Sequence, residues 1–193
     1  STQYEPSHPG RLVHTDIAGP FRRSAHGHFQ YMLVIIDDHS RFKFVYFLQT
    51  KSEATKVVRK FISSFNALAS RHGDHPVRAV GSLHSDNAGE YLSREFTEFL
   101  DESSVSQTTC PPHVHQLNGV AERAIRSIME ATRAHLVASQ SPIGFWNYAV
   151  EHAVDVINRT SGPPDSDISS YESLTGEKPR LLGIMPFGCR SYA

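Results

Sequence analysis

The chain has 193 residues, which suits one domain and is ample for a buried core. Hydrophobic residues make up 39% and charged residues 20%, and 19 Lys and Arg against 20 Asp and Glu give a net charge of −1. This balance argues against a protein whose whole surface binds nucleic acid, so such binding would need a local basic face or divalent cations.

Cysteine and histidine usage gives no sign of a structural metal site. Cys110 and Cys189 form neither a disulfide framework nor a zinc-ligand spacing, so we expect a reducing compartment and two free thiols. The His-x-His pairs, His26/His28 and His113/His115, lack further ligands nearby, and we favour solvated loops over a shared metal. No signal peptide or membrane span is visible. The sequence starts with Ser rather than Met, from which we expect a processed product or an excised piece.

The first part of the chain predicts an antiparallel meander of three strands. Leu12–Ile17 is a short strand that carries Asp16. Tyr31–Ile36 is a continuous apolar run, typical of a strand buried on both faces. After a turn at Asp37–Arg41, the segment Phe42–Leu48 is rich in aromatic and β-branched residues, which favours a third strand.

The clearest helix follows this meander. Thr50 and Glu53 have the spacing of a capping box, with Thr50 as the N-cap. Apolar residues then recur at spacings of three and four before Gly73 ends the helix: Ala54, Val57, Val58, Phe61, Ile62, Phe65, Leu68 and Ala69.

The second half alternates strands and helices. We expect a strand at Val77–Leu83, a helix at Arg94–Leu100, a strand at Val105–Cys110, a helix from about Val120 to Ala138, and a last helix from Ser141-Pro142 to about Ile157. PPHVHQLNG, residues 111–119, is a loop, and the closing PFGCRSYA is predicted as a terminal strand. The order β-β-β-α-β-α-β-α-α indicates an α/β domain with a mixed five-stranded sheet flanked by helices.

Two aspartates stand at or inside predicted strands. Asp16 lies within an apolar strand, where a carboxylate is costly unless it is paired or metal-bound. Asp86 follows the strand Val77–Leu83, in HSDNAGEY. The alternatives are a hydrogen-bonded strand aspartate for Asp16 and a turn residue for Asp86. Because Mg²⁺ prefers a few carboxylates with water and phosphate, a third carboxylate facing the same cleft would favour metal binding.

A third carboxylate, Glu122, lies at the start of the long helix. At 100° per residue, one side of this helix is mainly apolar: Ala121, Ala124, Ile125, Ile128, Thr132 and Leu136. A stripe roughly 100° away carries Glu122, Arg126, Met129 and Arg133, so we expect Glu122 to border the core. The alternative for Glu122 is a surface residue that complements the helix dipole.

Thirty-five residues separate Asp86 from Glu122. An Asp, Asp and Glu set with this spacing resembles the D,D-35-E signature of retroviral and retrotransposon integrases. Other segments resemble the Ty1/copia branch of this family: HSDNAGEY, HQLNGVAER, YMLVIIDDHSRF, GFWNYAVEHAVDVINRT, YESLTGEKP and FGCRSYA. The resemblance runs from about Leu12 to Ala193, nearly the whole chain.

The resemblance implies an RNase H-like fold and a divalent-metal-dependent polynucleotidyl transferase. In that family the first aspartate bridges two Mg²⁺ or Mn²⁺ ions, and the other two carboxylates each hold one. Carried over, Asp16 would bridge both ions, and Asp86 and Glu122 would complete the two sites. The reactions implied are processing of retrotransposon DNA ends and their joining to target DNA.

The remaining roles are less specific. The resemblance implies that Gln116 and Asn118 contact DNA near the scissile bond. Arg126 and Arg133 share the stripe of Glu122 and are candidates to bind phosphates; the alternatives are solvated charges or an Arg126–Glu122 ion pair. The implied partners are element-end and target DNA and further copies of the chain as a homodimer or higher oligomer, with no membrane. Action in the nucleus after a cytoplasmic particle stage is also implied, without secretion.

Domain boundaries follow from the same comparison of segments. We expect a linker over residues 1–11, the catalytic core over 12–160 and an extension of the core over 161–193. The sequence does not include the family's upstream His/His/Cys/Cys zinc domain, so we expect it to correspond to the catalytic core. Departures from the family pattern are Ala88 in place of a usual glycine, the loop at 111–119, and SSYESLTGEKP without its usual Thr-Pro opening.

Two other functions compete with this interpretation. One is a nuclease of the same fold, such as a ribonuclease H, and the other is a domesticated, non-catalytic module that binds DNA or protein. Asp37 and Asp38 are further candidate metal ligands, but they occupy a turn between strands, and we favour turn chemistry for both.

Overall fold

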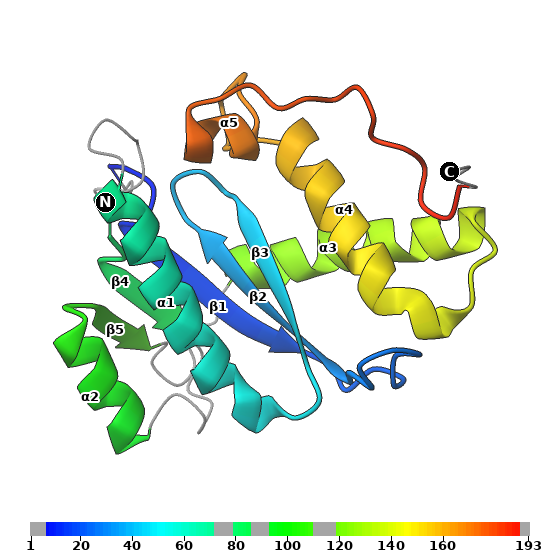
Figure 1. Cartoon of the computed structure of the whole chain (residues 1–193). Coiled ribbons are helices and arrows are strands. Elements are labelled where there is room, and N and C mark those ends of the chain that lie inside the picture. Colours follow the sequence, from blue (N-terminus) through cyan, green and yellow to red (C-terminus); the bar gives the residue numbers. More distant parts are fainter. Residues whose placement is uncertain (1–6, 72–78, 86–92, 110–118, 190–193) are drawn as a thin grey trace.

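The computed structural model describes residues 7–71, 79–85, 93–109 and 119–189. Within these ranges the strands form one mixed five-stranded sheet of order β3-β2-β1-β4-β5 (Figure 1). Its strands are β1 Leu12–Ala18, β2 Tyr31–Asp37, β3 Lys43–Leu48, β4 Ser82–Ser85 and β5 Ser106–Thr109. The first three strands pair antiparallel, whereas β4 runs parallel to both β1 and β5. The predicted fold class and the meander are confirmed.

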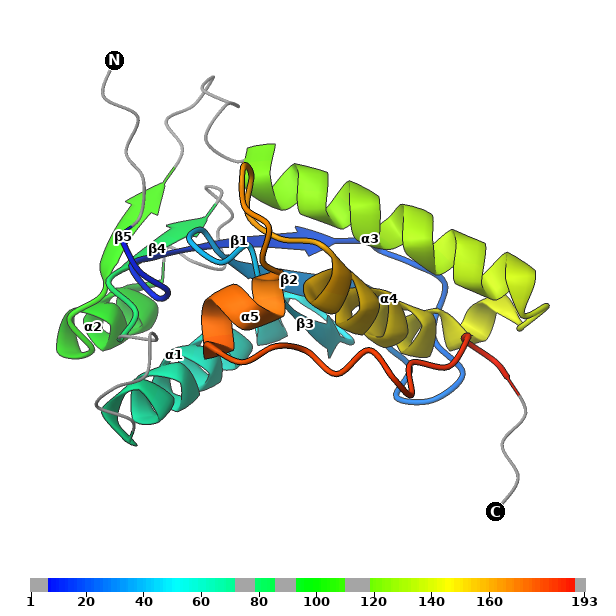
Figure 2. The same ribbon diagram turned by 90° about the horizontal axis from the view of Figure 1, so that it is seen from above.

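Helices cover both faces of this sheet. They are α1 Ala54–Arg71, α2 Arg94–Glu102, α3 Gly119–Ala138, α4 Trp146–Thr160 and α5 Ser170–Thr175, with short 3-10 turns at Lys51–Glu53 (η1) and Ile143–Phe145 (η4). Figure 2 shows α1 and α2 on one side of the sheet and α3 on the other. Helix α3 packs on β1 and β2 and also contacts α4.

Strand β2 divides the core because alternate side chains of a strand point to opposite faces. Leu33 and Ile35 belong to the cluster that includes Val58 and Ile62 of α1, and all four are fully buried. The remaining apolar residues of β2 pack on the opposite face against α3 and α4: Met32, Val34 and Ile36. The prediction that this strand is buried on both faces is confirmed.

The start of α1 differs from the predicted capping box. Thr50 has extended backbone, but its side chain caps no backbone N–H and instead contacts the Ser52 hydroxyl at 2.9 Å. The Glu53 carboxylate accepts a hydrogen bond from the backbone N–H of Gln49 at 3.0 Å, one residue earlier than a capping box requires. The reciprocal bonds are not formed because Lys51–Glu53 is a 3-10 turn, which changes which N–H groups the two side chains can reach.

The start of α4 is also later than predicted. Pro142 precedes the 3-10 turn, and the α-helix begins at Trp146 without a side-chain cap. Tertiary contacts hold this helix end: the Trp146 indole N–H donates to the carbonyl of Arg22 at 2.8 Å. Its ring lies 4.9 Å from that of Phe21 and 5.4 Å from that of Phe47, measured between centroids.

Two features of the tail differ from expectation as well. Helix α5 was not predicted; the Ser169 side chain caps it at the Glu172 N–H, and Gly176, at φ 76°, ends it. No strand forms over residues 186–189, and the rest of the predicted terminal strand lies outside the described residues. Strand β4 begins at Ser82, later than the predicted Val77, although residues 77 and 78 are not described. Within the described ranges, no helix has the length and hydrophobicity needed to cross a bilayer.

Candidate active site

Asp16 lies in the middle of β1, the central strand of the sheet. It is half-buried, and one of its carboxylate oxygens accepts a hydrogen bond from the backbone N–H of Ile17 at 2.8 Å. Its partner across the antiparallel pair is Val34, a residue of the core beneath α3 and α4. Directly opposed residues of an antiparallel pair project to the same face, so Asp16 projects to the α3 face of the sheet.

Glu122 lies in the first turn of α3, the helix that covers this face. Ala121 and Ala124 on either side of it are buried against the sheet, while the Glu122 side chain is exposed. Glu122 therefore lies at the edge of the core, next to buried alanines, as predicted. Its carboxylate lies in solvent. The described ion pairs include none between Glu122 and Arg126.

Three of the predicted site residues lie outside the described residues: Asp86, Gln116 and Asn118. The last described residue before Asp86 is Ser85, which pairs with Thr15 in the parallel β1–β4 ladder. Thr15 directly precedes Asp16, so the sequence neighbours of both aspartates are paired. Of the described residues, no three His, Cys, Asp or Glu side chains form a group able to hold a metal ion.

A group of polar residues lies towards the start of β1, next to His14. His14, two residues before Asp16, pairs with His84 across the parallel ladder, and their ring centroids are 5.4 Å apart. The Nε2 atom of His14 lies 3.1 Å from Oδ1 of Asp38, an electrostatic contact. Arg41 contacts the same oxygen at 2.7 Å. Burial raises the pKa of Asp38, but His14 and Arg41 outweigh burial and hold this pKa below its usual range.

The surroundings of His84 favour its neutral form. Burial and the neighbouring His14 lower the pKa of His84 below its ordinary value, and its Nδ1 atom lies 3.0 Å from the hydroxyl oxygen of Thr108. The group near His14 therefore contains one ion pair, Asp38–Arg41, and a histidine, His84, whose neutral form is favoured.

The turn between β2 and β3 uses Asp37 as the sequence predicted. The Asp37 carboxylate is fully buried and accepts hydrogen bonds from the backbone N–H of Gly10 at 2.7 Å and of Ser40 at 2.8 Å. It also accepts from the Ser40 hydroxyl at 2.6 Å. With these donors and the Asp38–Arg41 ion pair, turn chemistry is confirmed for both aspartates.

Other predicted residues lie on exposed surface. Arg126 and Arg133 are exposed along α3, and neither forms an ion pair within the part of the chain that is described. His26 and His28 are exposed in the β1–β2 loop, as expected of solvated loop residues. Cys189 is a free, exposed thiol.

The sequence prediction missed a group of cations near the first turns of α3. Arg123 of α3, Arg41 of the β2–β3 turn and Lys43 of β3 line one cavity. In the sequence, this group was indicated by Arg123 and Ser127, which are four residues apart and therefore lie on one face of the helix. Arg41 and Lys43 had no such signal, because only the packing of the turn beside α3 brings them there.

Comparisons with solved structures show that this architecture is the RNase H-like fold, which retroviral integrase cores share. The HTLV-2 integrase catalytic core domain in complex with magnesium (trimeric form) matches with a TM-score of 0.63 over 88% of this chain and 99% of that chain, at 16% identity. A chain of the simian T-cell lymphotropic virus intasome in complex with PP2A regulatory subunit B56 gamma matches with a TM-score of 0.69 over 92% of this chain and 58% of that chain, at 17% identity. At these identities the likeness concerns the fold.

Sequence relatives then give the family. The family model described as Integrase core domain matches residues 6–115, more than half of the chain, and the chain belongs to this family. It is 36% identical over 182 residues to the retrovirus-related Pol polyprotein from transposon TNT 1-94 of Nicotiana tabacum. It is 31% identical over 168 residues to that from transposon RE1 of Arabidopsis thaliana, and 24% identical over 181 residues to the transposon Ty1-LR3 Gag-Pol polyprotein of Saccharomyces cerevisiae.

These relatives identify an integrase catalytic core of a Ty1/copia-type LTR retrotransposon. The matches cover 94%, 87% and 93% of this chain but only 13%, 11% and 10% of those polyproteins. The chain therefore corresponds to a small part of each relative.

Proposed function

We propose that this chain is the catalytic core of a divalent-metal-dependent polynucleotidyl transferase, which processes the ends of retrotransposon DNA and joins them to target DNA. One observation carries the proposal. The β1–β2 register places Asp16 on the sheet face covered by α3, and the first turn of that helix carries Glu122. Two residues 106 positions apart in the sequence thus belong to one side of the sheet.

The residues suit Mg²⁺ or Mn²⁺, two ions per site. Asp16, Asp86 and Glu122 would supply hard oxygen ligands, and the Glu122 side chain is exposed to solvent. The proposal requires the carboxylate of Asp86, two residues after His84, to share the face of His84, as alternate residues of a strand do. When bound, the ions activate a water or 3′-hydroxyl and stabilise the leaving oxygen.

The protein's own contribution is to position the ligands. Asp16 is paired with Val34 of β2, its neighbour Thr15 is paired with Ser85 of β4, and the backbone that carries Glu122 is held by the burial of Ala121 and Ala124. Sites on strands and helices position reacting groups with greater precision than sites on loops. Arg126, Arg133, Gln116 and Asn118 are proposed to contact the DNA backbone, which orients the scissile phosphate for in-line attack.

The proposal is tested by a disintegration assay with Mn²⁺ and a branched DNA that mimics the strand-transfer product. We expect rejoined product from the wild type and a loss of at least about a hundredfold in Glu122→Gln, with DNA affinity unchanged. Glu130→Gln is the matched control, since Glu130 is also exposed on α3 and should retain activity. Equal product from Glu122→Gln and wild type would refute the assignment. Wild-type binding without any product would favour a domesticated, non-catalytic module.

We also propose that the chain forms a homodimer or higher oligomer on DNA ends, acting in the nucleus after a cytoplasmic particle stage. Two of the similar solved structures are called dimeric and trimeric forms of the HTLV-2 catalytic core. Light scattering at increasing concentration should show a mass above that of the 21.5 kDa chain. A monomer at every concentration, with and without DNA, would contradict the oligomer.

A further inference from the structure

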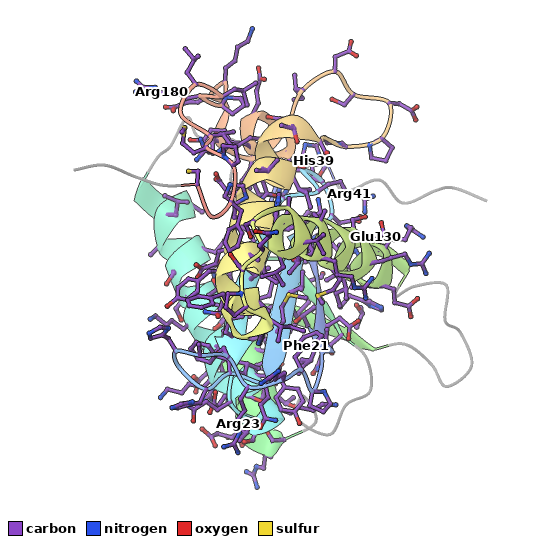
Figure 3. The ribbon with its side chains drawn as sticks, turned by 90° about the vertical axis from the view of Figure 1, so that its right-hand side faces the viewer. Phe21, Arg23, His39, Arg41, Glu130 and Arg180 are labelled. Atoms are coloured by element: carbon purple, nitrogen blue, oxygen red, sulfur yellow. The ribbon has the colours of Figure 1, made fainter. Side chains whose placement is uncertain are left out.

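A cavity of about 260 Å³ lies beside the first turns of α3, and neither Asp16 nor Glu122 lines it. Three segments far apart in the sequence form its walls. The walls include Arg41 and Lys43 from the β2–β3 hairpin, Arg123 and Ser127 from α3, and Gly162 and Pro164 from the segment after α4. Figure 3 shows Arg41 beside α3, on the side where the segment after α4 passes.

Among the described residues that line the cavity, three are cations and none carries a carboxylate. Arg41 is neutralised by Asp38 at 2.7 Å. Lys43 and Arg123 form no ion pair within the described part of the chain. The Lys43 ammonium donates one hydrogen bond, to the carbonyl of Arg41 at 2.9 Å, which leaves two of its three N–H groups for another acceptor. The cavity is therefore electropositive and has donors available.

The hairpin that presents Arg41 and Lys43 is held in place by other residues. Arg41 has a φ of 59°, a conformation that a bulky side chain rarely adopts without support. The Asp37 and Asp38 contacts described above supply this support on one side. On the other, the Asn158 side chain accepts from the Lys43 N–H at 2.9 Å and donates to the Lys43 carbonyl at 2.8 Å. Both cations are thus oriented before any ligand binds, which reduces the entropy lost on binding.

The surroundings of Lys43 destabilise the charged form of its side chain. Burial and the charge of Arg41 lower the pKa of Lys43 to about 8. A bound anion would supply the missing opposite charge and move this pKa back towards the ordinary lysine value. This effect gives a binding signal at one named atom, independent of catalysis.

We propose that the pocket of Arg41, Lys43 and Arg123 binds a backbone phosphate of the DNA held at the candidate active site. This inference rests on the proposed function. Ile36, which also lines the cavity, lies two residues from Val34, the partner of Asp16, on the same face. Two residues of a β-strand span roughly 7 Å. A DNA backbone that passes Asp16 can therefore reach the cavity. Guanidinium and ammonium groups are the side chains that proteins use most for DNA phosphates.

The test combines two ligands and three variants. Lys43→Met and Arg123→Gln each remove one pocket cation, and Lys60→Met removes an exposed lysine of α1, on the opposite side of the sheet. The first ligand is inorganic phosphate, followed by NMR of the Lys43 side chain. The second is a short DNA duplex, followed by fluorescence anisotropy at several salt concentrations. Thermal unfolding of each variant confirms that it is folded, and Arg123→Gln, at an exposed helix position, keeps the test valid should Lys43→Met unfold.

We expect phosphate to raise the pKa of Lys43 in the wild type and to have a smaller effect in Arg123→Gln. Each pocket variant should weaken duplex binding by about five- to tenfold near 0.1 M salt and lower the salt-dependence slope by about 1, as loss of one phosphate contact does. Lys60→Met should bind like the wild type.

The outcomes separate this inference from the proposed function. Pocket variants that bind the duplex as tightly as Lys60→Met would overturn the inference, whether or not catalysis depends on Glu122. Phosphate binding at Lys43 in a protein that binds no duplex would leave an anion site but overturn its assignment to DNA. Weakened duplex binding in the pocket variants, together with active wild type and inactive Glu122→Gln, would support both proposals.

Discussion

At the residue scale, charged side chains of the β2–β3 turn and the adjoining strand ends have different tasks because their surroundings differ. Asp37 is fully buried and satisfied by three donors, so it fixes the backbone of the turn. Asp38 neutralises Arg41 and contacts His14. Lys43 has no carboxylate partner within the described residues, and its charge is destabilising at neutral pH.

Lys43 should make stability depend on alkaline pH. Its pKa is about 8 in the folded chain and near the ordinary 10.5 when unfolded, so the unfolded chain binds more protons between these values. The free energy of unfolding should therefore rise with pH from about 8 to 10.5 and show no Lys43 contribution to this slope below 8. The other charged groups that line the cavity with Lys43 are Arg41 and Arg123.

Urea unfolding of wild type and Lys43→Met in phosphate-free buffer checks this prediction. Lys43→Met should be the more stable protein at pH 7, and the difference should shrink as the pH rises towards 10. A difference that stays constant with pH would show that the Lys43 ammonium is not the source.

At the element scale, α3 combines packing and chemistry on different sides of one helix. Ala121, Ala124, Ile128 and Thr132 are buried against the sheet. The Glu122 side chain is exposed to solvent near the helix start. The Arg123 side chain packs against Gly119, where an added Cβ atom would lie 3.0 Å from the Arg123 guanidinium. The position of the candidate ligand and of the cationic pocket therefore both depend on how the apolar side of this helix packs.

Shortening Ile128 should destabilise the fold and leave Glu122 chemically intact. Ile128 is fully buried, so Ile128→Ala should lower the free energy of unfolding by about 2–5 kcal/mol, through lost burial and the cavity left behind. Val137→Ala is the matched control, since Val137 lies on the same helix and is 78% exposed; its change should stay within about 0.5 kcal/mol. Similar losses in both variants, measured by urea unfolding, would contradict the packing described for α3.

At the scale of the whole molecule, the sheet order brings together parts of the chain that are distant in sequence. The central strand β1 pairs with β2 on one side and with β4 on the other, and α3 then returns across it. This topology brings together Asp16, the residue before Asp86 and the helix that carries Glu122. In α/β sheets, ligands commonly bind beyond the carboxyl ends of parallel strands, the end at which Ser85 lies in β4.

A metal ion bound by the assembled fold should stabilise it, because the unfolded chain does not hold the ligands together. Mg²⁺ at ten times its Kd should add about 1.4 kcal/mol to the free energy of unfolding. EDTA should remove this gain, and Asp16→Asn should abolish it. Asp101→Asn, at an exposed position on α2, should retain the gain. An unchanged Mg²⁺ response in Asp16→Asn would show that the ion binds elsewhere.

The sequence alone determined the features that depend on neighbouring residues. The apolar run at Tyr31–Ile36 and the three- and four-residue spacing after Thr50 predicted β2 and α1, because side-chain periodicity follows directly from strand and helix geometry. The mixed α/β class followed from the order of such elements. The spacing of Asp86 and Glu122 and the motifs around them indicated the integrase family, which the family model and the relatives confirm.

Only the tertiary structure decided the features that depend on contacts between distant segments. Trp146, not Ser141-Pro142, begins α4, because its indole is bonded to Arg22 and packed between aromatic rings. The face of Asp16 was fixed by its register with Val34, which a strand pattern cannot specify. The pocket of Arg41, Lys43 and Arg123 exists because a hairpin, a helix and a later segment pack together. Local patterns set each element, whereas burial and pairing across the sheet set where its charged side chains meet.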